Sequence, residues 1–224
     1  MEFTLLLALG VVVIFLSIVT ISASWRRTKA RQARMAWLHQ WAHHHGLRYT
    51  PNDLSVARLS SRAPFNVGAD RIGRDIFRGS HNGRSLVFGE YQYTTRNRDK
   101  TELHQWQFVA LELPAPRPYL SISRANNGLL SSLFGDRGLQ LESQEFNDRF
   151  KIQTTSERFA YDVLNPRTME WLLADAHANT VGFRFDAHWA ITVRSGELRL
   201  DEVHRYADFL DAVIRLVPDF VWRW

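Results

Sequence analysis

The 224-residue chain contains no cysteine. Disulfides, thiolate metal ligands and a cysteine nucleophile are therefore excluded within it. Several motifs of known enzyme classes are also absent, namely G-x-S-x-G, H-E-x-x-H, G-x-x-x-x-G-K-[ST] and G-x-G-x-x-G. The sequence thus gives no reason to expect catalysis, and we predict a protein with no catalytic residue, no cofactor and no bound metal.

Most of the chain has no concentrated excess of positive or negative charge, although the formal net charge is +5. Residues 1–34 hold five of the 28 basic and one of the 23 acidic side chains, so the other 190 residues have a net charge of only +1. Nucleic-acid binding usually requires a concentrated basic face. We therefore expect no nucleic-acid partner.

One long apolar run is present, because residues 3–23 contain no charged side chain. At about 1.5 Å per residue, a helix of this length spans about 30 Å, the thickness of the hydrocarbon core of a bilayer. The run predicts a transmembrane anchor over residues 1–24. The alternative is a cleaved signal peptide, since Ser22-Ala23-Ser24 resembles a cleavage site, but the run is too long and no basic residue precedes it.

Basic residues flank this run on its C-terminal side only. By the positive-inside rule, the N-terminus is then outside and the rest of the chain lies in the cytoplasm at the cell membrane. The alternative is an envelope-associated domain outside the membrane. Side chains next to the run are predicted to contact anionic lipid head groups, at about 1 kcal/mol per basic residue. These membrane-interface residues are Trp25, Arg26, Arg27, Lys29, Arg31 and Arg34.

Residues 25–47 are predicted to form a basic amphipathic juxtamembrane helix. Its apolar face, with Trp37 and Trp41 four residues apart, packs either on the globular domain or in the lipid interface. Gly46 fits a left-handed C-cap at its end. His39 and His43 have the spacing of a zinc pair, but no acidic or sulfur ligand stands nearby, and histidines in a last turn also complement the helix dipole.

Residues 48–224 are predicted to form one α+β domain, an antiparallel sheet of hairpins packed by helices. Asn82-Gly83 between two alternating segments is the strongest hairpin signal. The proline-rich residues 114–118 are expected to end one strand and turn the chain, and Asp186-Ala187 to form the turn of another hairpin. The alternative is a pleckstrin-homology-like barrel. The expected strands are 75–80, 84–93, 103–113, 119–124, 150–154, 180–185 and 188–193, and the expected helices are 142–147, 166–177 and 201–217, with a short helix after residues 51–54.

Two groups of residues are weighed as binding or catalytic features. The glycine-rich residues 125–138 carry four large apolar side chains, which either contact a partner or lipid or fold back over the sheet. Glu90, Tyr91, His104 and Glu112 could converge across adjacent strands, and His177 and His188 could approach one another. Such residues are more often satisfied surface or core groups than catalysts.

A pattern within residues 139–195 resembles a known family. The helix start L-x-P-x-x-M-E-x-L, which follows an acidic-aromatic stretch and precedes a hairpin, is similar to that of an uncharacterised bacterial membrane-anchored family, a domain of unknown function. The resemblance implies a similar fold and a membrane anchor, and it brings no catalytic residue with it. The matching residues are Leu164, Pro166, Met169, Glu170 and Leu172.

Together these features predict a non-catalytic, single-span protein whose domain is a binding or scaffolding module at the inner membrane face. Its predicted partners are the lipid bilayer through residues 3–23, anionic lipid head groups and an unidentified protein. The alternatives are the envelope-associated domain and an enzyme without recognisable motifs.

Overall fold

The computed structural model describes residues 25, 28–97, 100–125 and 138–223. The chain divides into two compact units with the boundary between Gly46 and Leu47. In the first unit, a helix covers residues 28–44. Gly46 has φ +66°, as expected for a left-handed C-cap, and the His45 ring lies 2.8 Å from the Trp41 carbonyl oxygen at the end of the helix.

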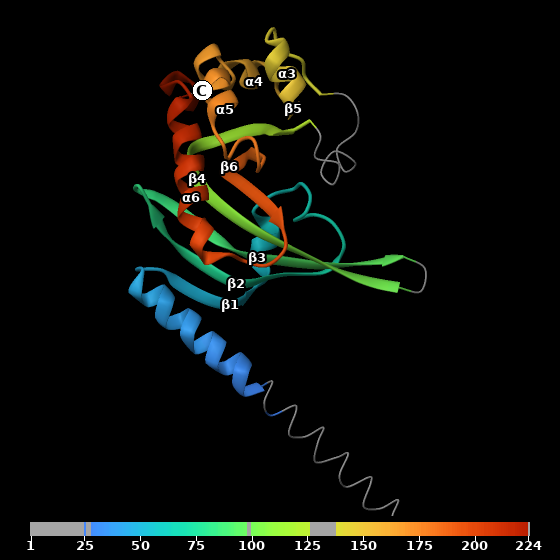
Figure 1. Cartoon of the computed structure of the whole chain (residues 1–224), viewed down its shortest axis with the longest axis vertical. Helices are drawn as coiled ribbons and strands as arrows, with labels where there is room; N and C mark the ends of the chain where they lie inside the picture. The colour runs from blue at the N-terminus through green and yellow to red at the C-terminus, as the bar shows by residue number, and fades with distance from the viewer. Residues whose placement is uncertain (1–24, 26–27, 98–99, 126–137, 224) are drawn as a thin grey trace, which may run out of the picture. The chain divides into compact units, whose positions relative to one another are not determined.

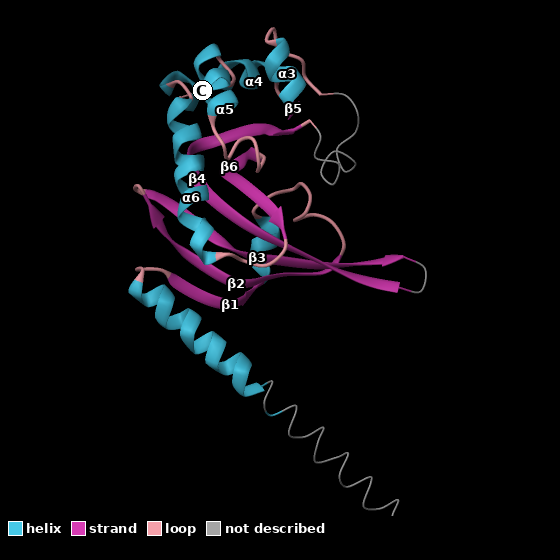
Figure 2. Ribbon diagram, viewed as in Figure 1, coloured by secondary structure: helices cyan, strands magenta, loops and turns pink. Residues whose placement is uncertain are grey.

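The second unit is built on a six-stranded antiparallel sheet (Figures 1 and 2). The order is β1-β2-β3-β4-β5, and β6 pairs with the other edge of β4. The Asn82-Gly83 hairpin is confirmed, since both residues have positive φ and join β2 to β3. The strands are β1 (Arg48–Asp53), β2 (Ala69–His81), β3 (Arg84–Asn97), β4 (Lys100–Arg124), β5 (Phe150–Thr154) and β6 (Phe183–Ser195).

Helices cover one face of this sheet. The longest, α6 (Leu200–Leu216), packs on β4 and β6. Phe209 of α6 contacts the Phe183 ring of β6, and Phe159 contacts Phe185 of the same strand. The other helices after β4 are α3 (Gln144–Arg149), α4 (Glu157–Val163), α5 (Pro166–Ala174) and the 3-10 turn η2 (Asp219–Trp222).

The opposite face of the sheet is covered by the segment between β1 and β2, which includes the 3-10 turn η1 (Leu54–Arg58). Phe65 of this segment is fully buried against the rings of Tyr91 and Phe108. Both faces of the central strands are thus buried, and the sheet is the middle layer of the domain.

The predicted fold class needs correction in its first element. Within the residues that the structure describes, no helix is long and apolar enough to cross a membrane. The predicted transmembrane segment, residues 3–23, lies outside the described residues. The same holds for Arg26, Arg27 and the four apolar residues noted within residues 125–138. The fold shown is a mostly antiparallel sheet domain with helices, and no transmembrane helix is among its elements.

The predicted chain reversal at the prolines is also wrong. β4 runs unbroken through Pro114, Pro116 and Pro118 as a 25-residue strand. The pairing with β6 shifts register between Glu112 and Arg117, opposite Ala187, whose φ is +50°. Prolines are tolerated at such a bulge because the ladder does not use their missing N–H groups. The expected hairpin at Asp186-Ala187 is therefore one bulged strand, β6.

Candidate functional site

The polar residues on β3 and β4 that the sequence singles out do not converge. Glu90 and Tyr91 are neighbours in β3 and point to opposite faces of the sheet. Glu90 accepts hydrogen bonds from Gln105 Nε2 at 2.8 Å and from the Leu198 backbone at 2.9 Å. The Tyr91 hydroxyl donates to the Phe65 carbonyl oxygen at 2.8 Å, and burial raises the pKa of Tyr91 to about 12. Each group thus has a structural partner of its own.

The remaining sequence candidates are equally dispersed. His104 stacks on Tyr93 with 4.8 Å between ring centroids. Glu112 lies where the β4–β6 register shifts. His177 packs against the rings of Tyr206 and Phe209, whereas His188 is exposed at the bulge of β6.

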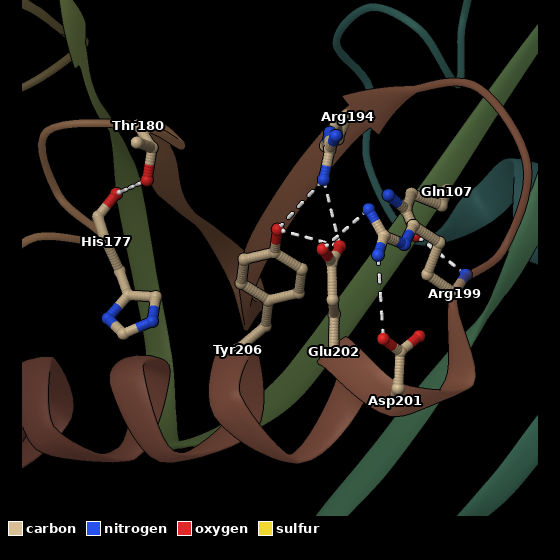
Figure 3. Close-up of polar contacts among 8 residues, drawn as sticks. All are labelled: Gln107, His177, Thr180, Arg194, Arg199, Asp201, Glu202 and Tyr206. Atoms are coloured by element: carbon tan, nitrogen blue, oxygen red, sulfur yellow. Dashed lines mark hydrogen bonds and ion pairs between the residues drawn. The ribbon is translucent and has the colours of Figure 1, made fainter.

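A polar network at the start of α6 brings together residues that the sequence did not point to (Figure 3). Arg194 Nη1 and the Tyr206 hydroxyl both donate to Glu202 Oε2, at 2.9 Å and 3.2 Å. Arg199 Nη1 lies 3.1 Å from Glu202 Oε1, and its backbone N–H donates to Gln107 Oε1 at 3.1 Å. The hydrogen bond to Tyr206 and the charge of Glu202 raise the pKa of Arg194 above its ordinary value.

This network has the features of a structural contact between α6 and β6. Two guanidinium groups and a phenol surround the Glu202 carboxylate, whose side chain is 13% exposed. The adjoining gap between α6 and β4–β6 measures about 10 Å³, which is room for about one water molecule. The arrangement ties the first turn of α6 to the end of β6.

A hollow of about 510 Å³ lies between α3 and α5, and we call it the α3–α5 hollow. Ser143 caps α3 by accepting from the Phe146 N–H, and Asn165 caps α5 by accepting from the Thr168 N–H. Arg149 Nη1 of α3 donates to the Leu173 carbonyl oxygen of α5 at 2.9 Å, which holds the two helices together. The lining residues are Ser143, Glu145, Pro166, Met169, Glu170, Leu173 and Ala174.

The α3–α5 hollow combines an apolar base with an acidic rim. Met169 and Leu173 are partly exposed, and Glu145 and Glu170 are exposed beside them. Glu145 lies 3.5 Å from Arg149, and its side chain remains 68% exposed. The hollow is shallow and widely open, so it suits a segment bound at the surface and does not enclose a small molecule. Chemically, it suits a ligand with apolar and basic groups in close proximity.

Only a part of this hollow could be foreseen from the sequence. Asn165-Pro166 correctly predicted the start of α5, and Met169 and Glu170 belong to the pattern noted above. The role of α3 was missed, because its position against α5 depends on tertiary packing and not on a motif. The predicted membrane-interface residues lie in the other unit, where Trp25 is 66% exposed and Lys29, Arg31 and Arg34 are exposed.

Comparison with known proteins gives one structural likeness. No family model and no curated protein matches the chain. The structure is similar to the crystal structure of the mycobacterial trehalose monomycolate transport factor A, TtfA, with a TM-score of 0.55 and 13% sequence identity. The match covers 81% of this chain and 94% of that chain. At this identity the likeness shows a shared fold alone.

Proposed function

We propose that the domain is a non-catalytic binding module that uses the α3–α5 hollow to hold a protein segment with both apolar and basic side chains. The carrying observation is the pairing of an apolar base, Met169 and Leu173, with the exposed carboxylates of Glu145 and Glu170. Apolar burial supplies affinity in such a groove, and the charges at its rim select the partner.

Two further findings support binding over catalysis. The sequence lacks the motifs of the common enzyme classes, and its polar candidates are engaged in separate structural contacts. The protein with the similar fold is named as a transport factor for trehalose monomycolate. A fold can serve unrelated functions, so this name adds weight only together with the site.

Site-specific photocrosslinking in cells of the source organism tests the proposal. A photoreactive amino acid replaces Met169 in the hollow in one full-length variant, and Arg158, whose side chain is 79% exposed on α4, in the control. We expect a discrete protein adduct from position 169 and none from position 158. The adduct is expected to disappear in Glu145→Lys/Glu170→Lys, because two basic groups then face the basic partner.

An adduct that survives the double charge reversal, or one that forms equally at both positions, contradicts a partner held in this hollow. The absence of an adduct at position 169 does the same. Turnover of a substrate by the purified protein, lost on changing one polar residue, would overturn the non-catalytic proposal and favour the enzyme alternative.

We also propose that the domain works at the inner face of the cell membrane. Support comes from the exposed basic residues Lys29, Arg31 and Arg34, because the cytoplasmic leaflet carries anionic lipids that attract such residues. Because the chain has no cysteine, single cysteines can report its location. Suitable sites are Arg158 and Asp201, whose side chains are 79% and 73% exposed.

A membrane-impermeant thiol reagent is then applied to intact and to opened cells. Labelling only after opening agrees with a cytoplasmic domain. Labelling of intact cells contradicts it and favours the envelope alternative.

A further inference from the structure

An arginine is buried on the face of the sheet that η1 covers. Arg184 lies in β6 and is only 5% exposed. Its Nη1 donates to the Ala63 carbonyl oxygen, and its guanidinium lies 5.4 Å from the Phe65 ring centroid. A buried guanidinium normally requires partners for all of its donors, because an unpaired buried charge is costly.

Two donors of Arg184 lack such partners. Within the residues that the structure describes, Nε and Nη2 form no hydrogen bond, although both atoms are buried. The N–H groups of Nε and Nη2 lie side by side on one edge of the guanidinium plane. This edge binds the two oxygens of a carboxylate through parallel hydrogen bonds.

The surroundings of Arg184 add a second donor and positive charge. Across the ladder, Tyr119 lies two residues before Ser121, the register partner of Arg184, so that all three share one face. The buried Tyr119 hydroxyl also has no hydrogen-bond partner among the described residues. The Arg62 guanidinium lies 4.6 Å from the Tyr119 ring centroid.

One oxygen of the nearby acid, Asp186, already accepts a hydrogen bond. Asp186 is 8% exposed, and its Oδ2 accepts a hydrogen bond from the Ser60 hydroxyl at 2.6 Å. Both Asp186 and Arg62 act on the charge of Arg184, and burial lowers the pKa of Arg184. The carboxylate of Asp186 offsets only one of the two positive charges, so the cluster of Arg62, Arg184 and Asp186 has a net charge of +1.

A small hollow beside Arg184 limits the size of a ligand. It measures about 20 Å³ and is lined by Arg184, Ser121, Ser123, Gly182 and apolar side chains of β4 and β6. A cavity needs about 10–15 Å³ to hold one water molecule, so one or two oxygen atoms fit into this hollow. That matches a carboxylate and is too small for the four oxygens of a phosphate. Ser121 and Ser123 are partly exposed, which leaves the hollow accessible from solvent.

We propose that Arg184, with Tyr119 and Ser121, forms a binding site for a carboxylate group. The carboxylate lies against the Nε–Nη2 edge, and the hydroxyls of Tyr119 and Ser121 donate to it from the β4 side. The group is supplied either by a small free carboxylic acid or by the acidic end of a larger aliphatic molecule. This site is separate from the α3–α5 hollow and does not depend on the function proposed for it.

Thermal unfolding of the full-length protein in acetate and in hexanoate tests the site, with chloride at matched ionic strength as the reference. We expect both carboxylates to raise the Tm in a saturable manner, because they bind the folded state only. Arg184→Lys replaces the two-donor edge with a point charge, and we expect it to raise the half-saturating concentration at least about tenfold. Arg158→Gln, at an exposed position on α4, is expected to respond as the natural protein does.

Tyr119→Phe keeps the test decisive if Arg184→Lys folds poorly. It removes a buried hydroxyl that has no partner in the described chain, so the Tm without carboxylate should not fall. The half-saturating concentration should rise about three- to tenfold through the lost hydrogen bond. An equal response of Tyr119→Phe and Arg158→Gln contradicts the site, as does an equal effect of chloride.

The two ligands distinguish the sources of the carboxylate. Equal half-saturating concentrations indicate a small free acid. Much tighter binding of hexanoate indicates the acidic end of a longer aliphatic molecule. In both cases, the site is supported only if Arg184→Lys or Tyr119→Phe binds the carboxylate more weakly than the natural protein does.

Discussion

Among single residues, Asp211 joins the C-terminal helix to the tip of the first hairpin. It is 3% exposed and accepts hydrogen bonds from Asn82 Nδ2 at 2.8 Å and Arg84 Nε at 3.1 Å. Arg215 Nη2 lies 2.6 Å from Oδ2, the oxygen that also accepts from Asn82. The carboxylate therefore connects segments more than 120 positions apart in the sequence.

We expect Asp211→Asn to lower the free energy of unfolding by about 2 kcal/mol, since an amide cannot replace a carboxylate that accepts charged hydrogen bonds. Urea denaturation of the full-length protein measures the change. Asp208→Asn is the matched control on the same helix, because the Asp208 side chain is 67% exposed and has a single contact with His81. Its expected cost is below about 0.5 kcal/mol. Equal losses in the two variants would contradict the role given to Asp211.

The same carboxylate makes stability depend on pH. Burial alone would raise the pKa of Asp211, but hydrogen bonds from Asn82 and Arg84 and the charges of Arg215 and Arg84 hold it below its ordinary value. A lowered folded-state pKa means that the stabilisation is present above the unfolded pKa of about 3.9 and is lost as the pH falls through the folded pKa. The difference between natural protein and Asp211→Asn should therefore shrink below about pH 4. A constant difference from pH 7 to pH 2 would be incompatible with this account.

Among the elements, the β4–β6 pair contains the irregularity that sequence patterns misread. Ala187 is exposed and has φ +50°, a conformation that costs a residue with a Cβ about 1–2 kcal/mol. Glycine avoids this cost but loses about 0.5–1 kcal/mol more through its freedom in the unfolded chain. We expect Ala187→Gly to stabilise the protein by about 0.5–1 kcal/mol.

Ala190→Gly, three residues along the same strand, is the matched control. Ala190 is fully buried in regular pairing opposite Leu111, so the same substitution should destabilise by about 1 kcal/mol. Chemical denaturation compares the two variants. A loss of stability in both would show that the bulge at Ala187 is not strained.

Elements with local signals were predicted well, and those that depend on distant pairing were not. Asn82-Gly83, Asn165-Pro166 and the apolar period of α6 mark hairpin and helices by chemistry within a few residues. In the sequence, the prolines of β4 and Asp186-Ala187 of β6 predict turns. In the structure, these two segments lie opposite each other and form one bulge. The carboxylate site was missed for the same reason, because the η1 segment and β6 contribute to it from more than 120 residues apart.

At the scale of the whole molecule, the exposed basic residues near Trp25 and the acidic rim of the α3–α5 hollow lie in different parts of the chain. The α3–α5 hollow belongs to the unit Leu47–Trp224, where the rim carries carboxylates. The exposed residues Lys29, Arg31 and Arg34 belong to the other unit. Each unit can therefore meet a different partner, and the prediction for the basic unit is an anionic lipid surface.

Cosedimentation of the full-length protein with vesicles tests this prediction. The measured quantity is the ratio of binding to vesicles with phosphatidylserine and to vesicles of phosphatidylcholine alone, because apolar attraction contributes to both. At about 1 kcal/mol per basic residue, Lys29→Gln/Arg31→Gln/Arg34→Gln should lower this ratio by roughly a hundredfold, and 1 M salt should lower it as well. The matched control, Arg71→Gln/Arg158→Gln/Arg167→Gln, removes three basic residues from the other unit and should leave the ratio close to that of the natural protein. Equal ratios for the two triple variants would show that net charge, and not the segment next to Trp25, determines lipid preference.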